Sequence, residues 1–226
     1  MTGPTTGPAV GVLFETDDYL AVDKPEGLSC IPERDKSVPS LIKMLEGERG
    51  CRLFVVHRLD KEASGVIVYA KSAEAHRHLN DLFADRKVEK RYVLLAHGVI
   101  SEESGTIDMP IREFGSGRMG VDERRGKRSV TEFRVIERLP TTTLVDAHPL
   151  TGRRHQLRVH FYARGNPILG DQRYGDHALQ EQFPRLMLHA TRIAFTARDG
   201  TAVSVECTAP AAFNDVLIQC HNAQVK

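Results

Sequence analysis

Short apolar runs separated by polar turns dominate the chain and predict a sheet with few helices. The runs at 12–14 and 19–22 flank a Thr-Asp-Asp turn and predict a β-hairpin. Further strand-like runs lie at 54–56, 66–69, 91–96, 129–136, 143–147, 191–197 and 202–207. Helical spacing of apolar residues is confined to 40–45, a segment after Ser72, 153–164 and 211–221. This irregular order predicts an α+β fold with a mixed sheet rather than repeated βαβ units.

Two segments lack that pattern. Residues 1–11 are mostly Gly, Pro and Thr, which predicts a disordered tail ahead of one domain over 12–226. The stretch from Asp108 to Arg128 is rich in Gly, Arg and polar residues. It predicts an exposed arm or a hairpin with a long loop.

Composition excludes several classes of protein. The 226 residues are 41% hydrophobic and 27% charged, as in an ordinary globular chain. No apolar run approaches the roughly 20 residues that span a bilayer, and no signal peptide is visible. The four cysteines are scattered without a C-x-x-C pair, which predicts reduced thiols and a cytoplasmic location.

Charge is balanced overall but unevenly distributed. The chain has 31 Lys and Arg against 30 Asp and Glu, yet 148–173 holds five arginines and a single acid, Asp171. Two more basic strips lie at 86–91 and 124–128. Such strips give a polyanion a local footprint, although any one of them taken alone is more simply explained as a solvated face.

Three candidate motifs fail on their context. Gly115–Gly120 matches G-x-G-x-x-G, but a charged segment follows it instead of an apolar helix, so no nucleotide cofactor is expected. The histidine pairs 76/78 and 155/160 miss the i, i+4 spacing of a helical zinc site. Ser64 does not stand in a G-x-S-x-G elbow.

The segment His57-Arg58-Leu59-Asp60 remains as the best candidate for catalysis. It follows one predicted strand and precedes another, which places a carboxylate on a rigid scaffold within reach of a ligand. The alternative is an aspartate that caps a turn. A pocket carboxylate needs a cationic partner to stay ionised, and the nearest cluster of candidates is Arg153, Arg154 and Arg158.

Together these segments resemble the RluA family of pseudouridine synthases. The matching segments occur in the family's order within about residues 12 to 213. They are 22–28 (VDKPEGL), 57–66 (HRLDKEASGV), 90–92 (KRY), 151–160 (TGRRHQLRVH), 166–171 (NPILGD) and 188–190 (LHA). H-R-L-D combined with the downstream T-G-R-R-H-Q-L-R is highly specific. Ala63 departs from the threonine that is common in the family.

The resemblance implies a pseudouridine synthase fold, a mostly antiparallel mixed sheet with flanking helices and a central catalytic cleft. It implies isomerisation of uridine to pseudouridine inside structured RNA, with extrusion of the target nucleotide into a pocket. The isomerisation involves no net redox change, so no cofactor or metal is expected. The match begins close to Met1, so no separate S4 RNA-binding module is expected.

The resemblance also assigns roles to residues. It makes Asp60 the essential carboxylate, Arg158 its guanidinium partner, and Tyr92 an active-site tyrosine that stacks on the base or relays a proton. Arg58 fills the gap left by the flipped base, and His57 beside it is expected to contact the RNA as well. Leu188 packs near the pocket, although a plain core position explains Leu188 equally well.

The expected partner is RNA, either transfer RNA, large-subunit ribosomal RNA or both through a shared stem-loop. Arg153, Arg154 and the strip at 124–128 are the expected phosphate contacts, on a monomer. Two rivals stay open at this point: a catalytically silent RNA-binding protein or RNA chaperone on the same fold, and a metal-dependent hydrolase built on the histidines.

Overall fold

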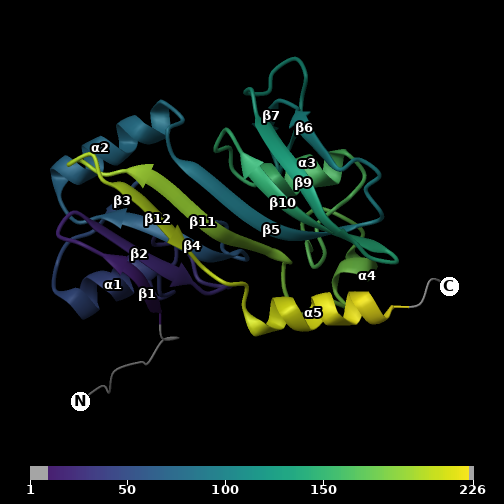
Figure 1. The fold of residues 1–226 in the computed structure, drawn as a ribbon, viewed down its shortest axis with the longest axis horizontal. Coiled ribbons are helices and arrows are strands. Elements are labelled where there is room, and N and C mark those ends of the chain that lie inside the picture. Colours follow the sequence, from purple (N-terminus) through teal and green to yellow (C-terminus); the bar gives the residue numbers. More distant parts are fainter. Residues whose placement is uncertain (1–9, 224–226) are drawn as a thin grey trace. The chain divides into compact units, whose positions relative to one another are not determined.

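Two groups of residues make up the fold of the computed structural model, which describes residues 10–223. The first unit holds the chain up to Val88 and Arg192–Cys207, and the second holds Glu89–Thr191 and the chain from Thr208. Figure 1 labels most of their elements. The tail predicted at 1–11 falls mostly outside the described residues, and the first strand begins at Gly11. The single domain predicted over 12–226 stays a prediction.

The first unit is a sheet with the strand order β1-β2-β4-β11, in which β3 also pairs with β4 and β12 with β11. Its strands are β1 (Gly11–Glu15), β2 (Tyr19–Lys24), β3 (Phe54–Val55), β4 (Ser64–Ala70), β12 (Ala202–Glu206) and the later part of β11 (Leu188–Thr196). β1 and β2 form the predicted antiparallel hairpin. Every residue of β4 is buried, in keeping with the apolar run that makes up most of this strand.

Two helices complete the first unit. α1 (Leu41–Arg49) ends at Gly50, whose φ of 63° is the left-handed conformation that stops a helix. α2 (Ala73–Ala84) begins as predicted after Ser72, whose hydroxyl accepts a hydrogen bond from the Ala75 N–H.

The second unit is an antiparallel sheet with the strand order β5-β10-β9-β6, plus a small hairpin of β7 and β8. Its elements are β5 (Glu89–His97), β6 (Ser104–Asp108), β7 (Ile111–Glu113), β8 (Met119–Val121), β9 (Val130–Arg138), β10 (Thr142–Pro149), α3 (Gln156–Ala163), α4 (His177–Gln180) and α5 (Ala211–Asn222). The hairpin confirms the arm predicted near 108–128.

Alternation along β9 shows which face of this sheet is covered. Phe133 and Val135 are buried, whereas Glu132 and Arg134 are exposed. The Phe133 ring meets the Phe161 ring of α3 edge to face at 6.0 Å. α3 therefore covers the face to which Phe133 points.

The main differences between the predicted and the observed elements concern α3, β6 and α4. α3 begins at Gln156 rather than 153, because His155 has a φ of 53° and cannot continue a right-handed helix backwards. β6 and the four-residue α4 were not predicted. Within residues 10–223, no helix is long and apolar enough to cross a membrane.

Candidate active site

The loop that carries Asp60 is anchored on both sides of this residue. On one side, the Cys30 thiol donates to the Leu59 carbonyl and accepts from the Leu59 N–H, both at 3.3 Å. Burial raises the pKa of this thiol, which keeps its proton available for donation. Leu59 itself is buried. The backbone before Asp60 is therefore fixed by a buried side chain.

On the other side, the anchor is a fully buried lysine. The Lys24 ammonium donates to the carbonyls of Pro25, Leu28 and Lys61 at 2.8, 2.9 and 3.1 Å. The Gly27 N–H donates to the same Lys61 carbonyl at 2.8 Å. These contacts tie the turn after β2 to the residue that follows Asp60. Asp60 is half-buried on a loop that needs no reorganisation to present it.

His57 and Arg58 differ in their surroundings. Nε2 of His57 accepts the Val68 N–H at 3.0 Å, and the ring stacks on Phe83 with centroids 5.1 Å apart. These contacts with β4 and α2 fix His57 within the first unit. Its predicted contact with RNA stays a prediction. Arg58 is exposed, as an RNA-contacting side chain must be.

Arg158 is held by a carboxylate within the second unit. Its Nε and Nη2 donate to the two oxygens of Asp171, each at 2.8 Å, and the side chains are only 3% and 0% exposed. Asp171 also accepts the N–H groups of Arg173 and Tyr174 at 3.1 Å. Such a bidentate pair fixes the plane of the guanidinium, so its direction is set by the fold.

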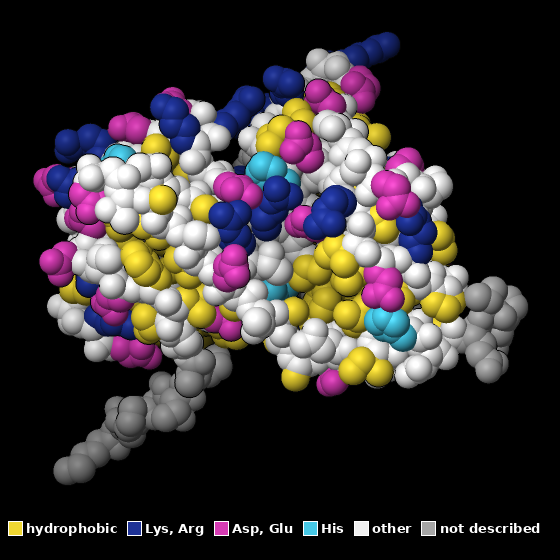
Figure 2. All heavy atoms as spheres, in the orientation of Figure 1, with side chains coloured by type: hydrophobic (Ala, Val, Ile, Leu, Met, Phe, Trp, Pro, Cys, Tyr) yellow, Lys and Arg dark blue, Asp and Glu magenta, His cyan; other side chains and the backbone are white. Residues whose placement is uncertain are grey.

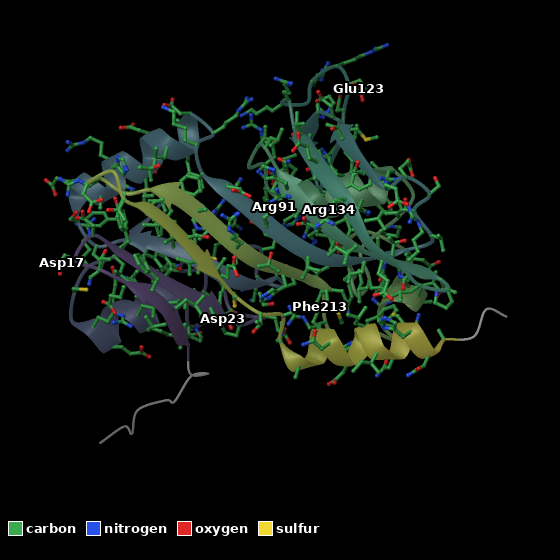
Figure 3. The ribbon with its side chains drawn as sticks, viewed as in Figure 1. Asp17, Asp23, Arg91, Glu123, Arg134 and Phe213 are labelled. Carbon is green, nitrogen blue, oxygen red and sulfur yellow. The ribbon has the colours of Figure 1, made fainter. Side chains whose placement is uncertain are left out.

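Tyr92 projects to the face of the second sheet that α3 covers. Tyr92 pairs with Ala147 on β10, which pairs with Phe133 on β9, so these three side chains form one row on one face. Figure 3 labels two residues of the opposite face, Arg91 and Arg134. Both form ion pairs with Asp146, at 3.3 and 3.6 Å. Tyr92 and Arg158 thus come from elements on the same side of this sheet.

The remaining predicted residues of the second unit have contrasting exposures. Leu188 begins β11 and is 3% exposed, a value that fits a core position as well as a pocket wall. Arg153 and Arg154 are exposed, and Arg154 pairs with Glu113 at 3.0 Å. Arg153 donates to the Arg128 carbonyl at 3.4 Å, which brings it to the base of the arm.

The arm, which we define as residues 109–128, presents basic side chains from a tightly bonded turn. The N–H groups of Arg124 and Arg125 both donate to Asp122 Oδ1 at 2.9 Å. Their side chains are exposed, and no carboxylate of the described chain forms an ion pair with either. Figure 2 shows dark blue side chains along this projection, whose Glu123 is labelled in Figure 3. The G-x-G-x-x-G match is simply the hairpin turn, in which Gly117 bonds to Phe114.

Two histidines of the second unit form hydrogen bonds within it. His155 Nδ1 lies 2.9 Å from the Tyr174 hydroxyl, and His160 bonds to Thr131 and to the Met109 carbonyl. Among residues 10–223, no three His, Cys, Asp or Glu side chains are grouped as metal ligands.

Each unit therefore assembles part of the predicted site. Asp60, His57 and Arg58 lie on one loop of the first unit, and Tyr92, Arg158 and Leu188 lie in the second. Sequence reasoning missed the contributions of three residues: Asp171, Lys24 and Cys30. Only Asp171 gave a signal, since it is the one acid in the basic stretch 148–173.

Comparison with known proteins agrees with this geometry. The RNA pseudouridylate synthase family matches residues 18–163. An uncharacterized RNA pseudouridine synthase of Zymomonas mobilis is 34% identical over 216 residues, 91% of this chain and 96% of that protein. The dual-specificity RNA pseudouridine synthase RluA of Escherichia coli is 36% identical over 197 residues, which cover 85% of this chain and 90% of RluA.

Solved structures support the same assignment. The human RNA pseudouridylate synthase domain-containing protein 1 superposes with a TM-score of 0.78 at 29% identity, and the match covers 99% of this chain and 98% of the human chain. The α+β fold predicted from the sequence is thereby confirmed. The chain belongs to the RNA pseudouridylate synthase family, and its reaction is the isomerisation of uridine to pseudouridine in RNA.

Proposed function

We propose that Asp60 is the essential carboxylate of this reaction and that the substrate is a stem-loop of transfer RNA, of large-subunit ribosomal RNA, or of both. The observation that carries the assignment is the anchoring of Asp60, whose neighbours Leu59 and Lys61 are fixed by Cys30 and Lys24. The substrate class is supported by two kinds of relative. One is the dual-specificity RluA, and the other is the ribosomal large subunit pseudouridine synthase C of Vibrio vulnificus, 35% identical over 206 residues.

The chemistry requires three changes at one nucleotide. The bond between C1′ and N1 breaks, the uracil turns, and C5 bonds to C1′. The proton on C5 leaves and N1 gains one, so atoms and electrons balance without a co-reactant. For this reason we propose that the enzyme needs no cofactor.

Asp60, Arg158 and Tyr92 divide this work in our proposal. An ionised Asp60 assists departure of the base or attacks the sugar, and Arg158 keeps it ionised and oriented. The Asp171 pair supports this role because it sets the direction of the guanidinium before substrate arrives. Tyr92 stacks on the extruded uracil, and its hydroxyl moves a proton.

RNA recognition falls to exposed cations. A base inside a stem must be extruded, at a cost of a few kcal/mol. Arg58 fills the space that the base vacates, Leu188 packs beside the pocket, and His57 supports Arg58 from the adjacent position. Arg153, Arg154 and the arm contact phosphates, a role that their exposure supports. We further propose a cytoplasmic monomer, in keeping with cysteines that are all thiols.

Mapping pseudouridine across total RNA tests this proposal directly. RNA from cells with and without the gene is treated with a reagent that forms an adduct on pseudouridine, and adducts are read at nucleotide resolution. We expect one or a few sites in transfer or large-subunit ribosomal RNA to disappear and to return with the wild-type gene. Unchanged maps in both RNA classes would refute the proposed substrate.

A further inference from the structure

A lysine lies two residues before Tyr92 on β5 and takes no part in the chemistry proposed above. Residues two apart on a strand project to the same face, roughly 6.6 Å from one another. Lys90 therefore projects to the same side as Tyr92, the side that α3 covers. Its exposure is intermediate, which is low for a long cationic side chain.

Titratable groups of β5 and α3 share this side of the sheet with Lys90. Tyr92, on the same strand, lies opposite Ala147 of β10. His160 and Arg158 lie on α3, and the charge of Arg158 is balanced by Asp171. Burial lowers the pKa of His160, so this imidazole is neutral near pH 7.

The ammonium of Lys90 has spare donors. An ammonium carries three N–H donors. One of them meets the Thr151 carbonyl at 3.5 Å, which is the long limit of a hydrogen bond. Within residues 10–223, no carboxylate lies at ion-pair distance from this group. Burial lowers the pKa of Lys90 to about 8, so most of the population is still protonated at pH 7.

A cation in that setting lacks a counter-ion. A half-buried charge is costly unless it is paired and hydrogen-bonded. The anion that an RNA substrate supplies is the phosphodiester, which stays ionised at every pH at which the protein is folded. A nucleotide stacked on Tyr92 would bring its own phosphate, or that of its neighbour, to the side of the sheet from which Lys90 projects two residues away on β5.

We propose that Lys90 binds a backbone phosphate of the substrate RNA at the nucleotide presented to Tyr92. This inference rests on the proposed function, since it takes RNA as the ligand and Tyr92 as a site residue. Lysine suits the task because its ammonium is a point charge that accepts phosphate from several directions. Lys90 is then a substrate-binding residue that acts on affinity rather than on bond breaking.

Binding of RNA to variants tests the proposal. Unmodified transfer RNA transcripts and a large-subunit ribosomal RNA stem-loop serve as probes, in a D60N background that prevents turnover. K90M keeps the length of the side chain without the charge. We expect it to weaken affinity on the order of tenfold and to reduce the salt slope of log Kd by about 0.7 to 1. K43M is the matched control, because Lys43 is exposed on α1 and paired with Glu46 at 2.7 Å.

A pH series separates the charge of Lys90 from its packing. Phosphate binding needs the protonated amine, and the free protein loses this proton as pH rises through about 8. Affinity should therefore fall between about pH 7 and pH 9 in the parent protein. K90R stays charged and should hold its affinity over the same range, on the same RNA.

Two outcomes would overturn the inference. One is a K90M variant that folds and keeps the parent affinity and salt slope. The other is a K90M variant, with Asp60 restored, whose kcat falls while RNA binding is unchanged, because Lys90 would then act on a proton. If K90M fails to fold, the pH series tests the inference instead. A K90R affinity that falls between about pH 7 and pH 9 as the parent affinity does would then overturn it. Failure of the proposed function is a separate result, namely a wild-type protein that binds these RNAs and forms no pseudouridine.

Discussion

Arg158 and Asp171 show how one residue can be placed for chemistry by another. The pair is almost fully buried and bidentate, and Asp171 also accepts two backbone N–H groups. Burying two charges adds little net stability, because desolvation offsets their attraction. Removing one partner is different, since the other charge is left buried and uncompensated.

D171N is expected to lower both stability and activity. The asparagine keeps the shape and still accepts backbone N–H groups, but it removes the charge that Arg158 faces. We expect unfolding in urea to show a loss of about 3 to 5 kcal/mol. Pseudouridine formation should fall in the remaining folded protein.

R154A is the control for the unfolding measurement. Arg154 pairs with Glu113 on the surface, with side chains 45% and 53% exposed. A pair of this kind contributes less than about 1 kcal/mol. If D171N unfolds at the same urea concentration as R154A and the wild type, the buried pair has no such role.

The two roles proposed for Tyr92, stacking and proton transfer, can be separated by one substitution. Y92F keeps the aromatic face and removes only the hydroxyl. Single-turnover kinetics should show that the rate of conversion falls by about 100-fold or more, with RNA affinity nearly unchanged. An undiminished rate would limit Tyr92 to stacking.

At the scale of elements, the segment between α3 and α4 tolerates little added volume at Gly170. Gly170 adopts a φ of +74°, and a Cβ added there would lie 1.8 Å from the Arg185 carbonyl oxygen. The next residue is Asp171, so this close approach of two backbone segments positions the partner of Arg158.

G170A should therefore be strongly destabilising. The methyl group clashes with backbone that has no flexible end, and the left-handed φ disfavours alanine as well. We expect thermal unfolding to show a large drop in Tm, or no soluble protein. G47A is the control, because Gly47 lies inside α1 with open space around its Cβ position, and alanine there should stabilise by up to about 1 kcal/mol. Equal Tm values for the two variants would contradict the packing described.

Much of this architecture is readable from sequence because local signals carry it. The β1–β2 hairpin, the Ser72 cap, the β7–β8 arm and α5 follow from periodicity and turn residues. β6 was not predicted because three of its five residues are exposed and only one is buried, so the strand has little apolar pattern. The start of α3 was misplaced because the left-handed His155 leaves no mark in a residue pattern.

The site residues also differ in whether the sequence predicts them. Asp60, Tyr92 and Arg158 were predicted as site residues from motifs whose order along the chain resembles that of the family. Lys24 and Cys30 were not, because a lysine that binds three carbonyls and a thiol that clamps a backbone look like a surface residue and a core residue in sequence. Such roles depend on contacts between distant segments, which composition does not record.

At the scale of the molecule, a net charge of +1 conceals local positive surfaces. Exposed Arg124 and Arg125 stand on the arm, and Arg153 lies at its base. Polyanion binding depends on such local surfaces and on counterion release, not on net charge.

RNA affinity should accordingly fall steeply with salt. Replacing Arg124 and Arg125 together by alanine should reduce the slope of log Kd against log salt by about 1.5, since two phosphate contacts are lost. R77A, an exposed arginine on α2, is the control and should leave the slope unchanged. A parent affinity that hardly changes between low and physiological salt would show that these cations do not contact phosphate.

The most direct measurement is single-turnover conversion of a mapped uridine by wild-type protein and by D60N. The account predicts that D60N binds the RNA within about twofold of wild type and loses conversion by on the order of 10³-fold or more, because a neutral amide cannot act as the ionised carboxylate. Conversion by a folded D60N at more than about a tenth of the wild-type rate would contradict the central role given to this residue.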